Sequence, residues 1–267
     1  MGLRSLDPSS WLEGGLDLAA QLIERDQLIA TQSSIIYQEV PGHEGEIKYF
    51  IEAIIENLSR YHSHEYEIRE PSITHKQTGL VADLQADQPL LELTRVIAED
   101  LCLLKKIEGI WTLVVGAVLF PSRWSLAEKI GSDIDQIHAP VPGYQVALQP
   151  FMGATLDKLS PNRTVWRKNW SLHSTSDLHQ SESIHQVAAP DDYWWRTERQ
   201  TLTRSSESEA ILFTIRNRAE PLSWIMARPD EASAFAATLQ SMSAETIEYK
   251  GLSADHQSLV RALMIAP

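Results

Sequence analysis

Cysteine is almost absent from this 267-residue chain, which contains only Cys102. A single thiol forms no internal disulfide bond and supplies no four-cysteine zinc site or iron–sulfur cluster within the chain. Apolar stretches are short as well, since none reaches the roughly 18 residues that a membrane span needs. The N-terminal residues also lack the pattern of a signal peptide. These absences predict a cytoplasmic protein without a membrane segment.

Positive charge is scarce too. The formal net charge is −13, and residues 1–110 hold 9 Lys and Arg against 19 Asp and Glu. Residues 111–224 are nearly neutral, with 11 Lys and Arg against 12 Asp and Glu, and they carry seven of the eight tryptophans. Sequence-independent binding of nucleic acid needs a positive field over much of the surface, so the charge excludes that class. Arginines interleaved with indoles suit a planar anionic ligand, and an aromatic core explains the same composition.

Hydrophobic periodicity predicts that the first third of the chain is mainly helical. Apolar residues recur at helical spacing in two segments, at Leu18, Leu22, Ile29, Phe50, Ile54 and Leu58. A further apolar stripe predicts a helix over Pro89–Lys105, with Asp87 as its N-cap. The segments 62–69 and 73–84 are expected to be strand or irregular connection.

From Gly109 onwards the pattern predicts a sheet. The continuous apolar run 110–120 is typical of a strand buried on both faces. Ser125 and Glu128 have the spacing of a capping box, and helices are expected over 133–138 and 144–159. Three strand-like runs follow at 164–172, 193–204 and 210–217, with a long loop over 174–192 and helices after Asp230.

This order of elements predicts an α+β fold with an antiparallel sheet and helices packed on one side. We expect three regions: a mainly helical region over 1–108, a sheet core over 109–225, and helices packed on that core over 226–267. Such a sheet and its helices can enclose a pocket for a small molecule.

His138 is the first candidate for chemistry. It lies four residues after Ile134 on an apolar helical face, and Pro140 and Pro142 restrict the chain that follows. An imidazole on a rigid apolar wall can serve as an axial ligand of haem iron. The commoner alternative is a core histidine that is hydrogen-bonded to a backbone carbonyl.

The second candidate is the polar strand over 193–204. Strand alternation places Arg196, Glu198, Gln200 and Arg204 on one face and Arg199 on the other. Arg167 and Asn169 share a face of the neighbouring strand and can meet the first group across the sheet. These side chains line a polar pocket or form an exposed ladder of ion pairs.

Other motifs are weak. His62 and His64 would point the same way from a strand, which suits a metal site or simply a solvated segment. No phosphate loop, dinucleotide fingerprint, nucleophile elbow or zinc-protease helix is present, and no serine or cysteine has the setting of a catalytic triad.

Several motifs, spread in order from near the N-terminus to about Leu222, carry a resemblance. They are Trp11-Leu12, Pro89-Leu90, Glu99-Asp-Leu-Cys-Leu103, Pro121-Ser-Arg-Trp-Ser-Leu-Ala-Glu-Lys-Ile-Gly131, Ile137-His-Ala-Pro-Val-Pro142, Arg167-Lys-Asn-Trp170, Arg196-Thr-Glu-Arg-Gln-Thr-Leu-Thr-Arg204 and Phe213-Thr-Ile-Arg216. Together they resemble the haem-dependent oxidative N-demethylase alpha-subunit family, whose members are dimethylamine monooxygenase-like.

The resemblance implies a PAS-like core that binds haem b and oxidises a small secondary amine, such as dimethylamine, with O2. It also implies that electrons come from NADPH through FMN and [2Fe–2S] centres on partner subunits, and that formaldehyde is released. On this basis we expect His138 to bind the iron, and Glu198, Arg199 and Gln200 to hold the amine and deliver protons. The expected cofactor contacts are Arg167, Asn169, Trp170, Arg196 and Arg204.

Two alternatives remain open from the sequence. A non-catalytic haem sensor or haem-binding protein would keep the same pocket without turnover. An interaction protein without a cofactor would use its aromatic residues only for packing.

Overall fold

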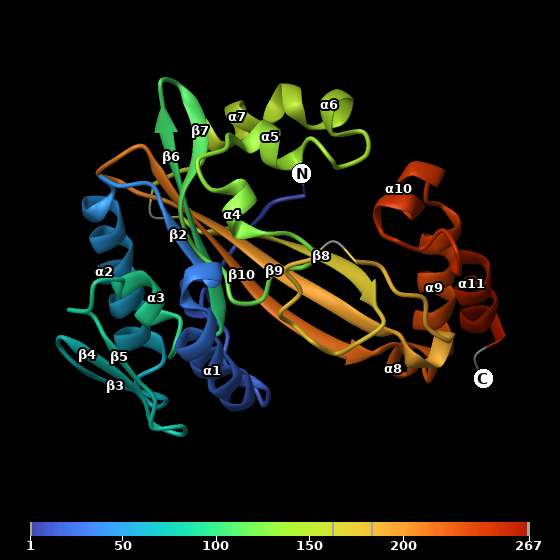
Figure 1. Cartoon of the computed structure of the whole chain (residues 1–267), viewed down its shortest axis with the longest axis horizontal. Helices are drawn as coiled ribbons and strands as arrows, with labels where there is room; N and C mark the ends of the chain where they lie inside the picture. Colours follow the sequence, from blue (N-terminus) through green and yellow to red (C-terminus); the bar gives the residue numbers. More distant parts are fainter. Residues whose placement is uncertain (1, 162, 183, 266–267) are drawn as a thin grey trace.

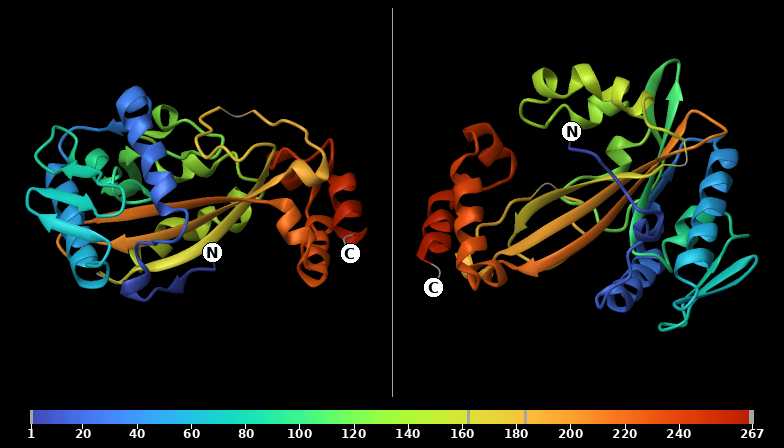
Figure 2. Two further views of the ribbon diagram at one scale, coloured as in Figure 1. Left: turned by 90° about the horizontal axis from the view of Figure 1, so that it is seen from below. Right: turned by 180° about the vertical axis from the view of Figure 1, so that it is seen from behind.

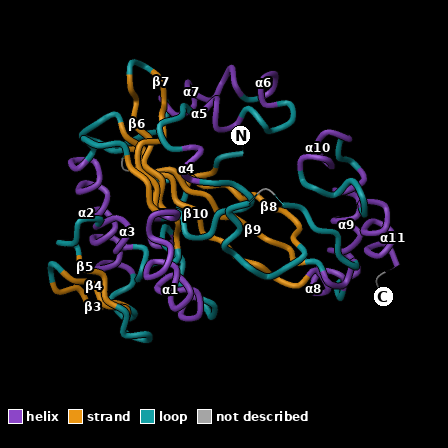
Figure 3. The backbone as a smooth tube through the Cα atoms, viewed as in Figure 1, coloured by secondary structure: helices purple, strands orange, loops and turns teal. Residues whose placement is uncertain are grey.

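The computed structural model describes residues 2–161, 163–182 and 184–265. One seven-stranded sheet runs through the centre of the molecule, and helices surround it (Figures 1 and 3). Its strand order is β1-β8-β9-β10-β6-β7-β2, and every neighbouring pair is antiparallel. The strands are β1 (Arg4–Ser5), β2 (Tyr37–Glu39), β6 (Glu99–Ile107), β7 (Ile110–Ala117), β8 (Val165–His173), β9 (Trp194–Arg204) and β10 (Ala210–Pro221).

A second, three-stranded sheet of order β3-β4-β5 lies beside the N-terminal helices. Its strands are β3 (Tyr66–Arg69), β4 (Ser72–His75) and β5 (Val81–Asp83). The α-helices are α1 (Leu18–Ile36), α2 (Glu44–Tyr61), α3 (Pro89–Leu93), α4 (Leu126–Lys129), α5 (Ile134–His138), α6 (Tyr144–Ala147), α7 (Gln149–Asp157), α8 (Leu222–Met226), α9 (Pro229–Gln240), α10 (Ala244–Tyr249) and α11 (His256–Ile265), and the short 3-10 helices are η1 (Pro8–Ser10) and η2 (Pro190–Asp192).

The two faces of the large sheet carry different covers. Leu103 and Leu212 are cross-strand partners that pack in one core cluster with side chains of α1 and α2. We call the face that bears them the α1 face. Cys102 and Phe213 are partners on the opposite side and cluster with Ile134 and other residues of α4–α7. That side is the α5 face. Helices therefore pack against both sides of the sheet, and the expectation that they pack on one side only is wrong.

The C-terminal helices lie at the end of the sheet away from α1–α3 (Figure 2). They form a separate core cluster in which Leu172 of β8 packs with Leu222, Leu239 and Leu259. The chain therefore holds a long sheet whose two ends are anchored by different sets of helices. Within the described residues no helix combines the length and apolar character that a bilayer span requires.

Most of the expected elements are confirmed. The α+β class, the helices around Leu22 and Ile54, the strand after Gly109, and the three-strand meander β8-β9-β10 all form. The long loop over 174–192 also forms, apart from η2 and from residue 183, which lies outside the described residues. The PAS-like classification and the division of the chain at residues 109 and 225 stay predictions, while β1, β2 and β6 join the large sheet from before residue 109.

The helix expected over Pro89–Lys105 is wrong beyond Leu93. Helix α3 ends there, and residues 99–107 form β6, which pairs with β10 on one side and β7 on the other. The apolar residues of this segment are buried on both faces of a central strand. An apolar run of this kind is compatible with both an amphipathic helix and a buried strand. Only pairing with distant strands decides between the two structures.

Two further expectations, for residues 125–128 and 144–159, are corrected by the structure. Ser125 is the N-cap of α4 but makes no side-chain capping bond, so the expected capping box is absent there. The single helix expected over 144–159 is divided into α6 and α7, because Leu148 leaves helical geometry at φ −122°.

Candidate functional site

Helix α5 is held against the edge of the sheet by a short backbone ladder. The amide of Leu113 in β7 donates to Ser132 O at 3.0 Å, and the amide of Gly131 donates to Leu113 O at 2.8 Å. Gly131 has φ +77°, a conformation that favours glycine and turns the chain into α5. Asp133 then caps the helix in a capping box, with its carboxylate 2.7 Å from the amide of Gln136.

His138 closes the last turn of α5 with its ring orientation set. Its Nδ1 lies 2.8 Å from Ile134 O, so Nδ1 carries the proton and donates it to that carbonyl. The ring stacks on Tyr144 with centroids 5.4 Å apart, and the Tyr144 hydroxyl donates to Asp135. Burial lowers the pKa of His138, and the positive charge of Arg167 lowers it further, while the bond to Ile134 opposes the change. The imidazole is therefore neutral at neutral pH, with a free lone pair on Nε2.

Strands β8 and β9 form a polar floor on the α5 face. Arg167 lies opposite Gln200, and Asn169 lies opposite Glu198. The Glu198 carboxylate accepts one hydrogen bond from Asn169 Nδ2 at 3.3 Å and another from Gln200 Nε2 at 2.9 Å. Lys250, just after α10, is close enough that the charge of Glu198 opposes the burial that lowers the lysine pKa. The floor therefore presents one oriented, half-buried carboxylate held by two amides.

The charges of two cations lower the pKa of His138. Arg167 and Lys129 are both half-buried, and both act on the pKa of His138. Neither side chain makes an ion pair or hydrogen bond with another described residue. A half-buried guanidinium without a carboxylate partner is suited to an anionic group supplied by a ligand.

The structure does not bring Arg199 and Trp170 to this floor. Arg199 lies on the α1 face, where it donates to the carbonyls of Ser10 and Trp11, and the Glu13 carboxylate lies 2.9 Å from its Nε. Trp170 also lies on the α1 face, where its ring contacts Phe235 of α9 at a centroid distance of 4.8 Å. Strand alternation turns both side chains away from His138.

Arg196 and Arg204 share the α5 face but have other partners. Arg196 is fully buried and donates to Phe120 O, Leu178 O and Asn217 Oδ1 at 2.5 to 2.9 Å. Arg204 donates to Asp157 O at the end of α7. Both guanidiniums thus hold the protein's own backbone in place, which argues against a contact with cofactor carboxylates.

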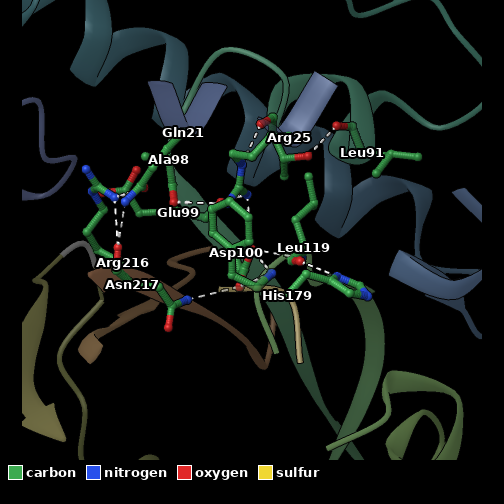
Figure 4. A network of polar contacts seen from close by, with 12 residues as sticks. Gln21, Arg25, Leu91, Ala98, Glu99, Asp100, Leu119, His179, Arg216 and Asn217 are labelled. Carbon is green, nitrogen blue, oxygen red and sulfur yellow. Dashed lines mark hydrogen bonds and ion pairs between the residues drawn. The ribbon is translucent and has the colours of Figure 1, made fainter. Parts of the chain in front are cut away.

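The partner of Arg196 belongs to a buried polar network that ties α1 to the sheet (Figure 4). Asn217 donates to Asp100 at 3.2 Å, and the amides of Leu119 and Phe120 donate to the same carboxylate. Arg25 of α1 lies 3.1 Å from Asp100, and both side chains are completely buried. The network holds the chain where it leaves β7, and it adjoins the polar floor, because Asn217 is the cross-strand partner of Glu198.

Sequence reasoning missed a third polar group on the α5 face. Ser171 Oγ lies 2.7 Å from His173 Nε2, and His173 Nδ1 lies 2.7 Å from Gln180 Oε1. Gln180 Nε2 donates to Asp177 O, so its oxygen faces the ring and accepts from Nδ1. Burial and nearby arginines lower the pKa of His173 to about 3, which makes it a poor general base. The spacing of Ser171 and His173 on one strand was a signal in the sequence, whereas Gln180 was not.

His62 and His64 do not form the expected pair. His62 is the C-cap of α2, with its amide bonded to Leu58 O, and β3 begins only at Tyr66. The two histidines therefore lie in a turn rather than on a strand. Among the described residues, no group of three or more His, Cys, Asp or Glu side chains is placed to hold a metal ion.

The donor chemistry around His138 fits a haem group. Histidines that bind metals usually donate their second ring N–H to a backbone carbonyl or a carboxylate, and His138 does so to Ile134. The uncompensated charges of Arg167 and Lys129 suit haem propionates. Glu198, Asn169 and Gln200 supply a polar surface beside Arg167.

A comparison with protein families gives a match over most of the chain. The family model described as haem-dependent oxidative N-demethylase, alpha subunit-like, matches residues 2–260. The matched range includes α5, the polar floor and almost all of the C-terminal helices.

Proposed function

The chain belongs to the haem-dependent oxidative N-demethylase alpha subunit-like family, and from this premise we propose that it demethylates a small secondary amine on a haem held by His138. The net reaction consumes O2, two electrons and two protons, and yields a primary amine, formaldehyde and water. Dimethylamine is the proposed substrate, and NADPH is the proposed source of electrons, through FMN and [2Fe–2S] centres on partner subunits.

The orientation of His138 carries this proposal. Its Nδ1 proton is committed to Ile134 O, so the neutral Nε2 is the ring atom that would bind the iron. Arg167 would hold the haem propionates, and Asn169 lies beside it on the same face. When bound, haem b would supply the activation of O2 that amino-acid side chains cannot provide.

Glu198 is the proposed amine-binding residue. A small secondary amine is protonated at neutral pH, and a carboxylate is the natural acceptor for its two N–H groups. Asn169 and Gln200 hold the Glu198 carboxylate in one orientation, because each donates to the same oxygen. The amine must lose its extra proton before it is oxidised, and the Glu198 carboxylate would accept that proton. Arg199, Trp170, Arg196 and Arg204 have no part in the proposed site.

The first test is the absorption spectrum of chain purified with haem available. A Soret band, together with NADPH-dependent release of formaldehyde from dimethylamine when a competent reductase is added, is the expected result. A Soret band without amine-dependent NADPH consumption would instead indicate a haem sensor. The absence of a protein-bound Soret band after reconstitution with hemin and removal of unbound hemin would refute the proposal.

The Glu198→Gln variant tests the amine site. The amide keeps the size of the side chain but removes the charge, so we expect the KM for dimethylamine to rise about tenfold or more, equivalent to ~1.4 kcal/mol. The Soret band should remain unchanged. Glu207→Gln, on the exposed turn between β9 and β10, is the matched control and should leave KM as it is. An unchanged KM in Glu198→Gln would remove this assignment.

A further inference from the structure

Positive charge collects around one strand of this acidic protein. Residues 158–176 contain four Lys or Arg and no Asp or Glu, although the whole chain has a net charge of −13. Three of these cations, Arg163, Arg167 and Lys168, lie in β8 or directly before it. Strand β1 adds Arg4, which is paired with Trp166 across the two strands.

These residues surround a hollow at the edge of the large sheet. Strand β8 pairs with β9 along its length, but its outer edge pairs with β1 only at Val165 and Trp166. A cavity of about 350 Å³ opens there and is lined by Gly2, Arg4, Trp166, Arg167 and Lys168. Arg163 is not part of this lining but is joined to β1, where its Nε donates to Ser5 Oγ, next to Arg4, at 3.3 Å. We call Arg4, Arg163, Trp166, Arg167 and Lys168 the β8 edge patch.

The cations of the patch have no anionic partner in the part of the chain that the structure describes. Among the described residues, none of Arg4, Arg163, Arg167 and Lys168 forms an ion pair. Charges on an exposed edge strand can serve merely to prevent pairing between sheets. That role needs neither a cavity nor a half-buried indole such as that of Trp166. Tryptophan and arginine, which both line this cavity, are among the residues that contribute most to binding at protein interfaces.

We propose that the β8 edge patch is the docking surface for an acidic protein, namely the iron–sulfur electron donor, and this inference rests on the proposed function. An acidic partner is repelled by most of a surface with net charge −13 and is attracted only where positive charge is concentrated. Arg167 belongs both to the patch and to the polar floor, since it lies opposite Gln200 on the face that carries Asn169 and Glu198. A donor docked there would lie beside the polar floor of the proposed haem site, which matters because electron transfer slows steeply with distance.

The experiment uses a plant-type [2Fe–2S] ferredoxin, an acidic protein, as the probe. Its Kd for the haem-loaded chain is measured by calorimetry at low and high salt, and its rate of haem reduction is measured by stopped flow. The test variant is Arg163→Glu/Lys168→Glu, with the single variant Arg4→Glu as a second probe of the patch. The control is Lys48→Glu/Arg60→Glu on α2, which changes the net charge equally at exposed positions.

We expect the test variant to weaken ferredoxin binding and slow haem reduction by about tenfold or more at low salt, and the control to change either by no more than ~2-fold. Added salt should weaken wild-type binding, because it screens these exposed charges. Equal losses in the test and control variants would show that only net charge matters and would overturn the proposal. Equally tight, patch-dependent binding of a single-stranded DNA oligonucleotide would overturn it too.

Failure of the proposed function is distinguishable from failure of this inference. A chain that binds no haem but holds ferredoxin through the patch would refute the function and support the docking surface. A chain that demethylates dimethylamine, and whose patch variants still accept electrons at the wild-type rate, would refute the docking surface alone.

Discussion

Replacing His138 with alanine separates ligation of the cofactor from stability of the fold. The change removes one hydrogen bond, from Nδ1 to Ile134 O, which contributes about 1 kcal/mol. It also removes the stack on Tyr144, which contributes about 0.5–1.5 kcal/mol. The sum, about 2 kcal/mol, is small beside the roughly 5–15 kcal/mol that stabilises a folded domain. His138→Ala should therefore stay folded, with Tm lowered by about 4–8 °C.

The same substitution should affect haem binding much more strongly than it affects stability. Without the Nε2 ligand we expect hemin to bind weakly and the Soret band to shift or disappear, and in His138→Gly added imidazole should restore the wild-type band. Hemin titration followed by absorption, with thermal unfolding of the same samples by circular dichroism, measures both effects. Tyr144→Phe is the control, because it keeps the stacked ring and removes only the hydroxyl that donates to Asp135. A wild-type Soret band and hemin affinity in His138→Ala would refute the reasoning.

Two further predictions concern the fold. His173 has a folded pKa of about 3 against 6.5 for the free side chain, so the unfolded chain takes up this proton first and stability falls as the pH drops from about 6.5 towards 3. In this range His173 contributes a loss of about 1.4 kcal/mol in the free energy of unfolding per pH unit. Urea unfolding at pH 4 and pH 7 should therefore show a smaller loss of stability at low pH in His173→Gln than in the wild type. Equal losses would contradict the assignment. Arg199→Met removes charged hydrogen bonds to Ser10 O and Trp11 O, and it should lower the free energy of unfolding by about 2–4 kcal/mol with the Soret band unchanged. A perturbed haem spectrum in this variant would show that Arg199 reaches the site after all.

The composition of the polar floor was predictable from local periodicity. Alternation along 193–204 placed Glu198 and Gln200 on one face and Arg199 on the other, and β9 has this pattern. The pairing of Asn169 with Glu198 followed from the order of three consecutive antiparallel strands. The same alternation places Arg199 on the face opposite Glu198, so the pattern itself argued against the expected catalytic role of Arg199.

The partners of the arginines were not predictable from the sequence. Arg196 donates to Phe120 O, 76 residues away, and Arg199 donates to Ser10 O, 189 residues away. Contacts at such separations depend on how whole elements dock, and the identity of the residue does not reveal whether its donors face a ligand or the protein's own carbonyls.

The amino-acid sequence by itself determined the helices of the N-terminal third, the meander β8-β9-β10, and the face on which each side chain of the meander lies. These features depend on periods of 3.6 and 2 residues, which are local properties of the chain. Tertiary structure alone decided that residues 99–107 form a central strand, because a buried strand and a helical stripe use the same apolar residues until neighbours pair with them. It also decided the setting of the half-buried His138 ring, which donates to Ile134 O and stacks on Tyr144 because β7 holds α5 in place. A candidate site assembled from three separate segments exists only when packing brings those segments together.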